Sequence, residues 1–346
     1  MAKDIRDIRI KLDTALLQAL PLGGEVISVV PLGLSNNCET CRIDVRLPGG
    51  GMQSFFEKVT LPTYLELMLA HWTAESSLYR FIPGHVPRPV AFGTYESVSS
   101  PVHFFLMEFA DLVPAPVPNP AAFMAPVIAL HRASMAKSPG GQFGFPVRTR
   151  FGHLAQDNTW ESSWEVWWTK HMTMTVDRER EIRGPYSSPE VGPLKDAFLN
   201  TVLPRYLRPL ETSGRSVAPC LLHTDLWPGN VQYYRPSNAN DEMKVAIFDA
   251  NGLWGHNEAE LGIISNPRCG VGQAYVDEYR KHMPASEPAV DADSRAFMYM
   301  IRHQICFATL YPGDPSLRDI WVDSMRLLVQ TVRDEKPPEK ASKGGS

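Results

Sequence analysis

Residues 222–230 carry the side chains with the clearest chemistry in this sequence. The stretch contains Asp225, and Asn230 follows five positions later. An apolar run then ends at Asp249, 24 positions after Asp225. Phosphoryl transfer from a nucleotide needs one carboxylate that deprotonates the attacking hydroxyl, and an amide oxygen and a second carboxylate that hold metal ions. The residue types and their order therefore indicate phosphoryl transfer.

Protein kinases use the same order of groups, in which His-Arg-Asp precedes an Asn and then Asp-Phe-Gly. Here His223 stands two positions before Asp225, and the spacing from Asp225 to Asn230 is that of kinases. Each element alone is weak, because His-x-Asp arises by chance and an Asp at a strand end is usually a turn residue or a helix cap. The combination predicts a kinase-like site.

Such a site needs a lysine that contacts the nucleotide phosphates, and Lys58 fits because it ends an aromatic strand over residues 53–59. Helical periodicity follows from Tyr64 to Phe81. Glu75 on this helix is the expected ion-pair partner of Lys58, whereas Glu66 comes too early to reach the middle of the helix. The alternatives are a solvated strand-edge lysine and an ordinary exposed glutamate.

A loop between two predicted strands, over residues 25–32 and 40–47, is the candidate phosphate-binding segment. Small residues there, Ser35 and Asn36 among them, would let backbone N–H groups approach the phosphates. Only one glycine is present, so a plain hairpin loop fits the local sequence equally well. Together these strands predict the beginning of a small β lobe.

An apolar strand over residues 103–107 runs into a polar exit at Glu108 to Ala110, which is typical of a hinge between two lobes. Backbone groups there would bond the adenine edge. The proline-rich run after residue 112 breaks regular structure. We therefore predict a nucleotide-binding lobe over residues 1–112 with a hinge at about 107–112, and a catalytic and substrate-binding lobe over residues 113–335.

The second lobe is expected to be mainly helical. Helices are predicted over residues 121–131, 160–175, 194–210, 272–283, 294–310 and 317–332, after a short one over residues 5–20. The fold class is therefore α+β, with two protein-kinase-like lobes: a small antiparallel β lobe with one helix and a larger helical lobe.

Composition limits the partners. The chain has 346 residues, 44% of them hydrophobic, and a formal net charge of −4 without a dense basic block. This argues against nucleic acid or an anionic membrane surface as a partner. The sequence contains neither an 18-residue apolar run nor a signal-peptide pattern, so we expect no membrane association and a cytoplasmic location.

Five scattered cysteines do not form a disulfide framework. Cys38 and Cys41 form a C-x-x-C pair without a second pair at zinc-ligand spacing, so reduced loop thiols are the main interpretation and a redox-sensitive pair is the alternative. The small, polar tail over residues 336–346 is expected to be disordered.

The segment from Leu222 to Asn230 resembles the His-Gly-Asp-Leu-Trp-x-Gly-Asn motif of the fructosamine/ketosamine-3-kinases, within the aminoglycoside phosphotransferase-like superfamily. Residues 141–145, 156–160 and 255–262 also fit that family, and the similarity spans roughly residues 25–330. Its character is that of fungal members. The family uses ATP and Mg2+ to phosphorylate the 3-hydroxyl of ketoamine sugars attached to amines, which leads to deglycation.

The resemblance implies a role for each site residue. Asp225 would be the base, and Asn230 and Asp249 the Mg2+ ligands. Lys58 and Glu75 would orient ATP. His223 would brace the catalytic loop. The resemblance implies that the substrate side is formed by Trp227, His256 and Glu258. Trp227 would stack on the sugar, although simple packing under the loop is the alternative.

Some positions depart from the family pattern. Thr224 replaces the usual glycine between His and Asp, and Ala250 and Asn251 follow Asp249 in place of the common residues. These changes flank the acceptor site, so another small hydroxylated metabolite remains an alternative substrate. A nucleotide-binding pseudokinase is a further alternative, whereas a protein kinase is disfavoured because no Ala-Pro-Glu-like segment follows. The sequence leaves monomer and homodimer open.

Overall fold

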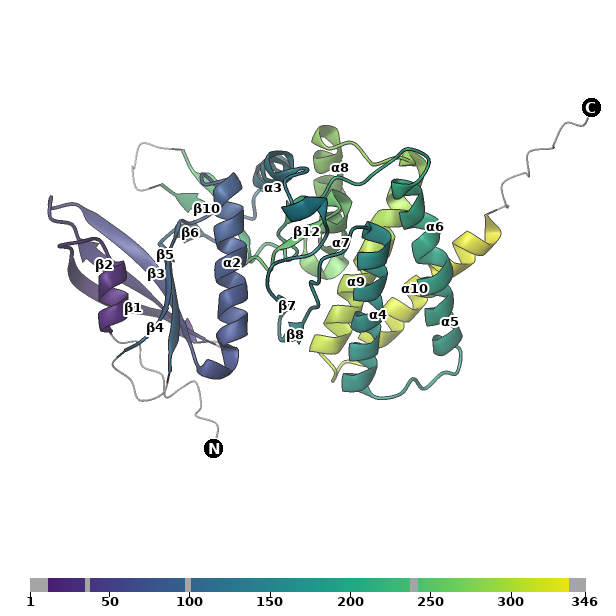
Figure 1. Ribbon diagram of the computed structural model, residues 1–346, viewed down its shortest axis with the longest axis horizontal. Coiled ribbons are helices and arrows are strands. Elements are labelled where there is room, and N and C mark those ends of the chain that lie inside the picture. Colours follow the sequence, from purple (N-terminus) through teal and green to yellow (C-terminus); the bar gives the residue numbers. More distant parts are fainter. Residues whose placement is uncertain (1–11, 35–37, 97–100, 237–241, 336–346) are drawn as a thin grey trace, which may run out of the picture.

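Residues 12–34, 38–96, 101–236 and 242–335 are described by the computed structural model of this chain. Figure 1 shows two parts side by side, a sheet with one long helix and a mainly helical body. Ser35 and Asn36, and the tail over residues 336–346, lie outside the described residues. Among the helices of the described ranges, none is long and apolar enough to cross a membrane.

An antiparallel sheet with the strand order β1-β2-β3-β5-β4 forms the small lobe. Its strands are β1 (Glu25–Leu34), β2 (Glu39–Arg46), β3 (Met52–Thr60), β4 (Pro89–Thr94) and β5 (His103–Glu108). In β2 the side chains of Cys41, Ile43 and Val45 are buried and alternate with more exposed ones, which is the period-two pattern of a sheet with one covered face. The strands predicted in this region are confirmed.

The helix predicted from Tyr64 to Phe81 is present as α2 (Leu65–Phe81), after a short 3-10 turn. It runs alongside the sheet on the side that faces the helical body (Figure 1). A second helix, α1 (Thr14–Ala19), begins at Asp13, whose carboxylate accepts from the backbone of Ala15 at 2.9 Å. It accounts for part of the helix predicted over residues 5–20, and residues 5–11 lie outside the described ranges.

After the hinge, the chain enters two small sheets that hold the segments of interest. β10 (Val231–Arg235) lies between β11 (Lys244–Ile247) and β6 (Asp111–Val113), and β9 (Cys220–Leu222) pairs with β12 (Leu253–Gly255). The turn over residues 223–230 therefore joins β9 to β10, and the turn over residues 248–252 joins β11 to β12. The lobe boundary proposed after residue 112 falls inside β6 and stays a prediction.

The large lobe is built mainly of helices, and the mixed two-lobed fold predicted from the sequence is confirmed. Its helices are α3 (Pro120–Ser134), α4 (Trp164–Arg183), α5 (Val191–Ala197), α6 (Leu203–Leu207), α7 (Leu261–Ile264), α8 (Gln273–His282), α9 (Ala292–Leu310) and α10 (Ser316–Asp334). Short strands β7 (Arg150–Phe151) and β8 (Leu154–Ala155) form a hairpin beside them.

Two helix predictions were wrong in extent. α4 continues eight residues past Thr175, to Arg183, and ends where Gly184 takes a φ of +80°. The single helix predicted over residues 194–210 is α5 and α6 separated by a π-helical turn at Phe198–Val202. Pro204 lacks a backbone N–H and cannot continue the regular bonding pattern, which accounts for the irregular turn before it.

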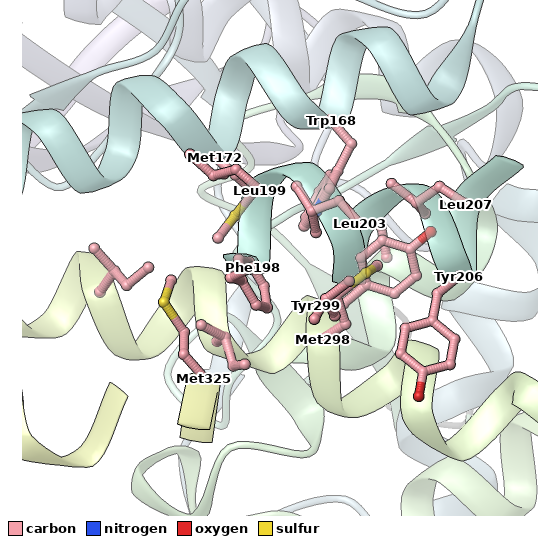
Figure 2. Close-up of a cluster of buried hydrophobic side chains, with 14 of the residues drawn as sticks. Trp168, Met172, Phe198, Leu199, Leu203, Tyr206, Leu207, Met298, Tyr299 and Met325 are labelled. Carbon is pink, nitrogen blue, oxygen red and sulfur yellow. The ribbon is translucent and has the colours of Figure 1, made fainter. Parts of the chain in front are cut away.

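The core of the large lobe lies among α4, α9, α10 and the π-helical turn. Figure 2 shows Trp168 and Met172 of α4 facing Met298 and Tyr299 of α9, with Phe198 between them and Met325. Trp164 is fully buried and donates its indole N–H to the Tyr299 hydroxyl at 2.8 Å. This core packs α4 and α9 against the sheet of β9 and β12, and so supports the turn over residues 223–230 that follows β9.

Candidate active site

A cavity of about 420 Å3 lies between the two lobes. Its walls come from β3, α2, β5, the hinge, and the ends of β10 and β11, and they are largely apolar. The lining residues include Phe56, Phe105, Met107, Glu108, Ala110, Asn230, Phe248 and Asp249, together with Lys58 and Glu75. Pockets for small molecules and cofactors are typically apolar with a few polar groups. A nucleotide would find its phosphate-facing groups at one end and the hinge at the other.

The turn from β9 to β10 is held rigidly by a buried carboxylate. Glu260 accepts from the backbone N–H groups of His223 and Thr224, at 2.6 and 2.8 Å. His223 is fully buried, its Nε2 lies 3.0 Å from the carbonyl of Phe248, and its own carbonyl accepts from Asn251 at 3.1 Å. These contacts tie the two site turns together and fix where Asp225 points.

Two residues in these turns have left-handed backbone angles. Thr224 has a φ of +68° and Asp249 a φ of +59°. A β-branched residue in this region is strained, since its Cβ crowds the backbone. Thr224 occupies the position where the family motif usually has glycine, which adopts this conformation without that cost. The fold therefore keeps a glycine-like turn even though the residue is threonine.

Asp225 is held by Asn230, whose Nδ2 donates to the Asp225 carbonyl at 3.0 Å and to its carboxylate at 3.1 Å. Burial, with the nearby negative charge of Asp249, raises the pKa of Asp225 to about 7. A carboxyl group with a pKa near neutrality is well matched to accepting a proton at physiological pH.

Lys58 donates to Asp249 at 3.0 Å and lies 3.1 Å from Nδ1 of His71. Burial opposes the charge of Lys58, but Asp249 outweighs it and raises the pKa of the lysine. In turn, Lys58 lowers the pKa of Asp249 well below its usual range. Asp249 therefore stays ionised, with about half of its side chain open to the cleft.

The predicted ion pair between Lys58 and Glu75 was wrong for this structure. Glu75 accepts from the backbone N–H of Ala250 at 3.0 Å. Its second carboxylate oxygen is buried without a hydrogen bond within the described residues. The ammonium group of Lys58 pairs with Asp249 instead. Burial raises the pKa of Glu75 to about 8. Glu75 lines the same cavity as Lys58 but braces the turn after Asp249 instead of pairing with the lysine.

The backbone N–H groups of the hinge residues 108–110 differ in whether they already have a hydrogen-bond partner. The backbone N–H of Glu108 donates to the Arg88 carbonyl at 2.8 Å, and that of Phe109 to the Ser54 carbonyl at 2.9 Å. The carboxylate of Glu108 binds Arg88 and Gln53. Within the described residues, the N–H of Ala110 is the one of the three without such a partner, which makes it the group best placed to meet a nucleobase.

Asn230 and Asp249 both line the large cavity and supply an amide and a carboxylate oxygen. Mg2+ prefers such oxygen ligands and takes the remaining ones from waters and nucleotide phosphates. The donor types therefore fit Mg2+. Among the described residues there is no group of three or more His, Cys, Asp or Glu side chains that would bind a metal without a nucleotide.

A second cavity, of about 200 Å3, opens on the other side of Lys58 and Asp249. Asp225 lines it, together with Tyr64, His71, Gly152 and Asn251. The side chain of Asn251 is 5% exposed, and its Nδ2 donor has no hydrogen-bond partner in the described chain. The two cavities share Lys58, His71 and Asp249, so a group bound in one lies next to a group bound in the other.

The predicted substrate residues do not lie in this second cavity. His256 is buried between Tyr299 and Ser286, at 2.9 Å from each hydroxyl, and burial lowers its pKa to about 4. Glu258 forms a buried ion pair with Arg295 at 2.8 Å. Both line neither cavity, and the interpretation of them as substrate contacts is corrected: their partners make them supports of the large-lobe core.

Trp227 is 45% exposed and also lies outside the lining of both cavities. Its ring packs against Gly229, where an added Cβ would come within 2.3 Å of it. The residues that sequence reasoning missed are His71, Tyr64 and Gly152, whereas Asn251 was noted only as a departure from the family pattern beside the acceptor site. His71 had a usable signal, because it stands four positions before Glu75 and therefore on the same face of α2. The others come from separate segments without a shared motif.

The fold and the two cavities define a kinase-like phosphotransferase. The sequence model of the family described as fructosamine kinase matches residues 36–318. This chain belongs to the fructosamine kinase family, and it is therefore an ATP-dependent kinase that acts on a hydroxyl group.

Individual relatives share a modest part of the sequence. A chloroplastic protein-ribulosamine 3-kinase of Arabidopsis thaliana is 28% identical over 246 residues, which cover 70% of this chain and 67% of that protein. A ketosamine-3-kinase of Mus musculus is 29% identical over 165 residues, 47% of each chain. The matched region thus spans two thirds of one relative and about half of the other.

Solved structures show the same fold. Candidate fructosamine-3-kinases of Haemophilus somnus and Thermobifida fusca give TM-scores of 0.63 and 0.64 at 17% and 22% identity. They cover 89% of this chain, and 92% and 95% of their own length is matched. A thermostable mutant of the aminoglycoside phosphotransferase APH(4)-Ia, in complex with AMP-PNP and hygromycin B, gives 0.57 at 15% identity over 94% of this chain and 99% of its own.

Proposed function

We propose that this kinase transfers the γ-phosphoryl group of ATP to the 3-hydroxyl of ketosamines, the fructosamine or ribulosamine adducts of amines. The observation that carries the proposal is the pair of adjoining cavities, which share Lys58 and Asp249 while Asp225 lines only the smaller one. A nucleotide in the larger cavity and a sugar in the smaller one would meet at these two residues. The ribulosamine and ketosamine substrates for which the relatives are named fit this arrangement.

In this proposal, Asp225 is the base. Asn230 orients its carboxylate, and a pKa of about 7 lets it accept the proton of the acceptor hydroxyl as the oxygen attacks phosphorus. His223 and Glu260 hold the turn in place through the backbone bonds described above. Proton transfer requires a base that is positioned close to the acceptor hydroxyl. Loss of Asp225 would therefore remove the proton-accepting group and slow the transfer step. The nucleotide cavity would stay intact, because Asp225 does not line it.

The phosphate end of the larger cavity would hold Mg2+ through Asn230 and Asp249, and the ion would neutralise charge on the phosphates. Lys58 supplies the fixed positive charge of the chain itself. Glu75 orients the turn after Asp249 through Ala250. Ser35 and Asn36 remain proposed phosphate contacts outside the described residues, and the hinge at Glu108 and Ala110 is the proposed adenine contact.

On the acceptor side, Asn251 supplies what a hydroxylated substrate needs. Within the described part of the chain its Nδ2 is a buried donor without a partner, and such a donor gains a hydrogen bond when a sugar oxygen enters the cavity. Trp227 remains proposed as a sugar contact at the exposed rim, where an indole face would cover the apolar side of a sugar ring.

The test is ADP release with Mg2+ against fructosyl-lysine, ribulosyl-lysine, free sugars and aminoglycosides, with the Asp225→Asn variant as a control. We expect turnover with the two ketoamines, and a product phosphorylated at the 3-oxygen by NMR. Turnover confined to free sugars or aminoglycosides would overturn the ketosamine assignment and leave the kinase assignment standing. Full activity of Asp225→Asn would overturn the role of Asp225.

A further inference from the structure

A small cavity of about 10 Å3 lies beside the turn over residues 223–230, and its lining residues are not those of the two larger cavities. It is lined by Trp168 and His171 of α4, by Thr224 of the loop, and by Arg302 and His303 of α9. Its volume is about that of one water-sized sphere, so it admits a single small species and excludes a phosphate, a sugar or a nucleotide.

Arg302 brings a buried positive charge to this cavity. Its side chain is 4% exposed, and within the described residues no carboxylate oxygen lies within 4.0 Å of its guanidinium nitrogens. The buried Arg295, by contrast, pairs directly with Glu258. The charge of Arg302 acts on Asp225, whose pKa it lowers against the larger effect of burial, but without direct contact. Buried charges are almost always paired, because removing them from water is costly, so the guanidinium group has room for an anion in direct contact.

Two histidines contact Arg302 without neutralising it. Nε of Arg302 donates to Nε2 of His171 at 3.0 Å, and Nη1 lies 2.8 Å from Nε2 of His303. A guanidinium group only donates, so both Nε2 atoms accept and each ring carries its proton on Nδ1. Burial, together with the charge of Arg302, holds the pKa of both histidines well below the usual range, which keeps them neutral.

The cavity also gathers buried polar atoms without hydrogen bonds. Nδ1 of His171, Nε1 of Trp168 and Oγ1 of Thr224 are all buried and unpartnered within the described chain. His303 is different, because its ring also interacts with the backbone of Tyr299 and Thr224. With its tautomer fixed by Arg302, Nδ1 of His171 is a donor, as is Nε1 of Trp168, and the threonine hydroxyl can donate as well. Leaving one such group unsatisfied is unfavourable, and three around a cation point to a missing acceptor.

We propose that this cavity binds one small monovalent anion, with chloride as the natural candidate. A halide ion accepts from several donors at once and carries a negative charge that offsets the charge of Arg302, and the side chains around the cavity would move slightly apart to admit it. A water molecule would accept two hydrogen bonds, but its own hydrogens would face donors and the charge would remain. Because Thr224 directly precedes Asp225, the bound anion would tie the catalytic loop to α4 and α9. This site is independent of the proposed acceptor.

The test is bromide replacement. Crystals of the full chain soaked in sodium bromide should show an anomalous peak beside Arg302, within contact of Thr224 and His171. In solution, protein dialysed into sodium gluconate should gain thermal stability when gluconate is replaced by bromide or chloride at constant ionic strength, with a rise in Tm on the order of 2 °C. An ordered water without anomalous signal, and equal Tm values in all three salts, would overturn the proposal.

Two variants separate the site from general salt effects. Arg302→Gln removes the charge, and Thr224→Val removes one donor while keeping the side-chain shape. Both should reduce the halide-dependent rise in Tm. Arg268→Gln, which removes an exposed arginine elsewhere in the large lobe, should retain it. If Arg302→Gln does not fold, the bromide peak in the unmodified protein and the halide titration of Thr224→Val still test whether the cavity binds an anion. A full halide response in Thr224→Val, together with no bromide peak, would count against the site.

Discussion

The two cavities on either side of Lys58 and Asp249 differ in how their walls are made. The larger one is a mostly apolar slot whose walls come from neighbouring strands, the hinge and one helix. The smaller one is lined on one side by the segment over residues 58–71, and single residues from distant places complete it: Gly152 in the β7–β8 hairpin, Asp225 after β9, and Asn251 after β11. If the two cavities bind nucleotide and acceptor as proposed, nucleotide binding would be a property of the fold, whereas acceptor binding would also depend on a few positions that can change separately.

The largest effect is expected at Asp225, which belongs to the acceptor side alone. Asp225→Asn keeps the size of the side chain and removes the proton acceptor. We expect kcat to fall by about 10^2- to 10^4-fold, with little change in the dissociation constant of ATP measured by calorimetry. A parallel loss of ATP affinity would show that the two cavities are not separable at this residue.

Lys58 should behave differently, because it belongs to both cavities. Lys58→Met removes the cation next to the phosphates and leaves the ionised Asp249 unpaired. We expect kcat/KM for ATP to fall on the order of 10^2- to 10^3-fold, and ATP affinity to fall with it. Glu75→Gln is the matched comparison: since Glu75 does not pair with Lys58 here, its loss should be clearly smaller. Equal losses would indicate that Lys58 and Glu75 pair during turnover.

Asn251 tests the acceptor wall by itself. Asn251→Ala deletes a single hydrogen-bond donor, which is worth about 0.5–1.5 kcal/mol to a neutral partner, or about 2- to 10-fold in affinity. We expect KM for the acceptor to rise by this factor and KM for ATP to stay unchanged, in steady-state assays that vary each substrate in turn. An unchanged acceptor KM would remove Asn251 from the substrate wall.

The same contrast explains what could be predicted from the sequence. Asp225, Asn230, Asp249 and Lys58 sit in or beside regular strands at fixed spacings, and the strand and helix pattern of the small lobe follows from alternation and periodicity. Asn251 was recognised only as a departure from the family pattern beside the acceptor site, and no spacing or periodicity assigned it a contact. Its place in the cavity results from a turn between two strands, and from a helix and a hairpin that approach it in space.

The assignments of His256 and Glu258 failed for a related reason. Both belong to the segment over residues 255–262, one of those that carry the family resemblance, and the resemblance implied a substrate role for them. The chain instead turns inward after β12, where His256 meets Tyr299 and Glu258 meets Arg295. Burial against α9 is a long-range consequence of the fold, and charged side chains give no local indication that they will be paired inside the core.

The smallest effect on turnover is expected at Glu57, which lies in the small-lobe core and lines neither cavity. It is fully buried, accepts from the Tyr95 hydroxyl at 2.6 Å and from the Cys41 thiol at 3.4 Å, and burial raises its pKa to about 7. Because the folded state binds this proton more tightly than the unfolded chain does, the stabilisation from protonated Glu57 is complete below about pH 4.5 and is lost as the pH rises to about 7.

Glu57→Gln keeps the side chain neutral at every pH. The free energy of unfolding of this variant should therefore not fall as the pH rises to about 7. At pH 8 we expect the variant to exceed the unmodified protein by on the order of 1–3 kcal/mol in the free energy of unfolding, measured by urea denaturation. At pH 4.5 the two should be nearly equal, and KM for both substrates should be unchanged. If the variant instead altered either KM, the small-lobe core would be coupled to the cavities, and the contrast between a fixed nucleotide scaffold and an independent acceptor wall would not hold.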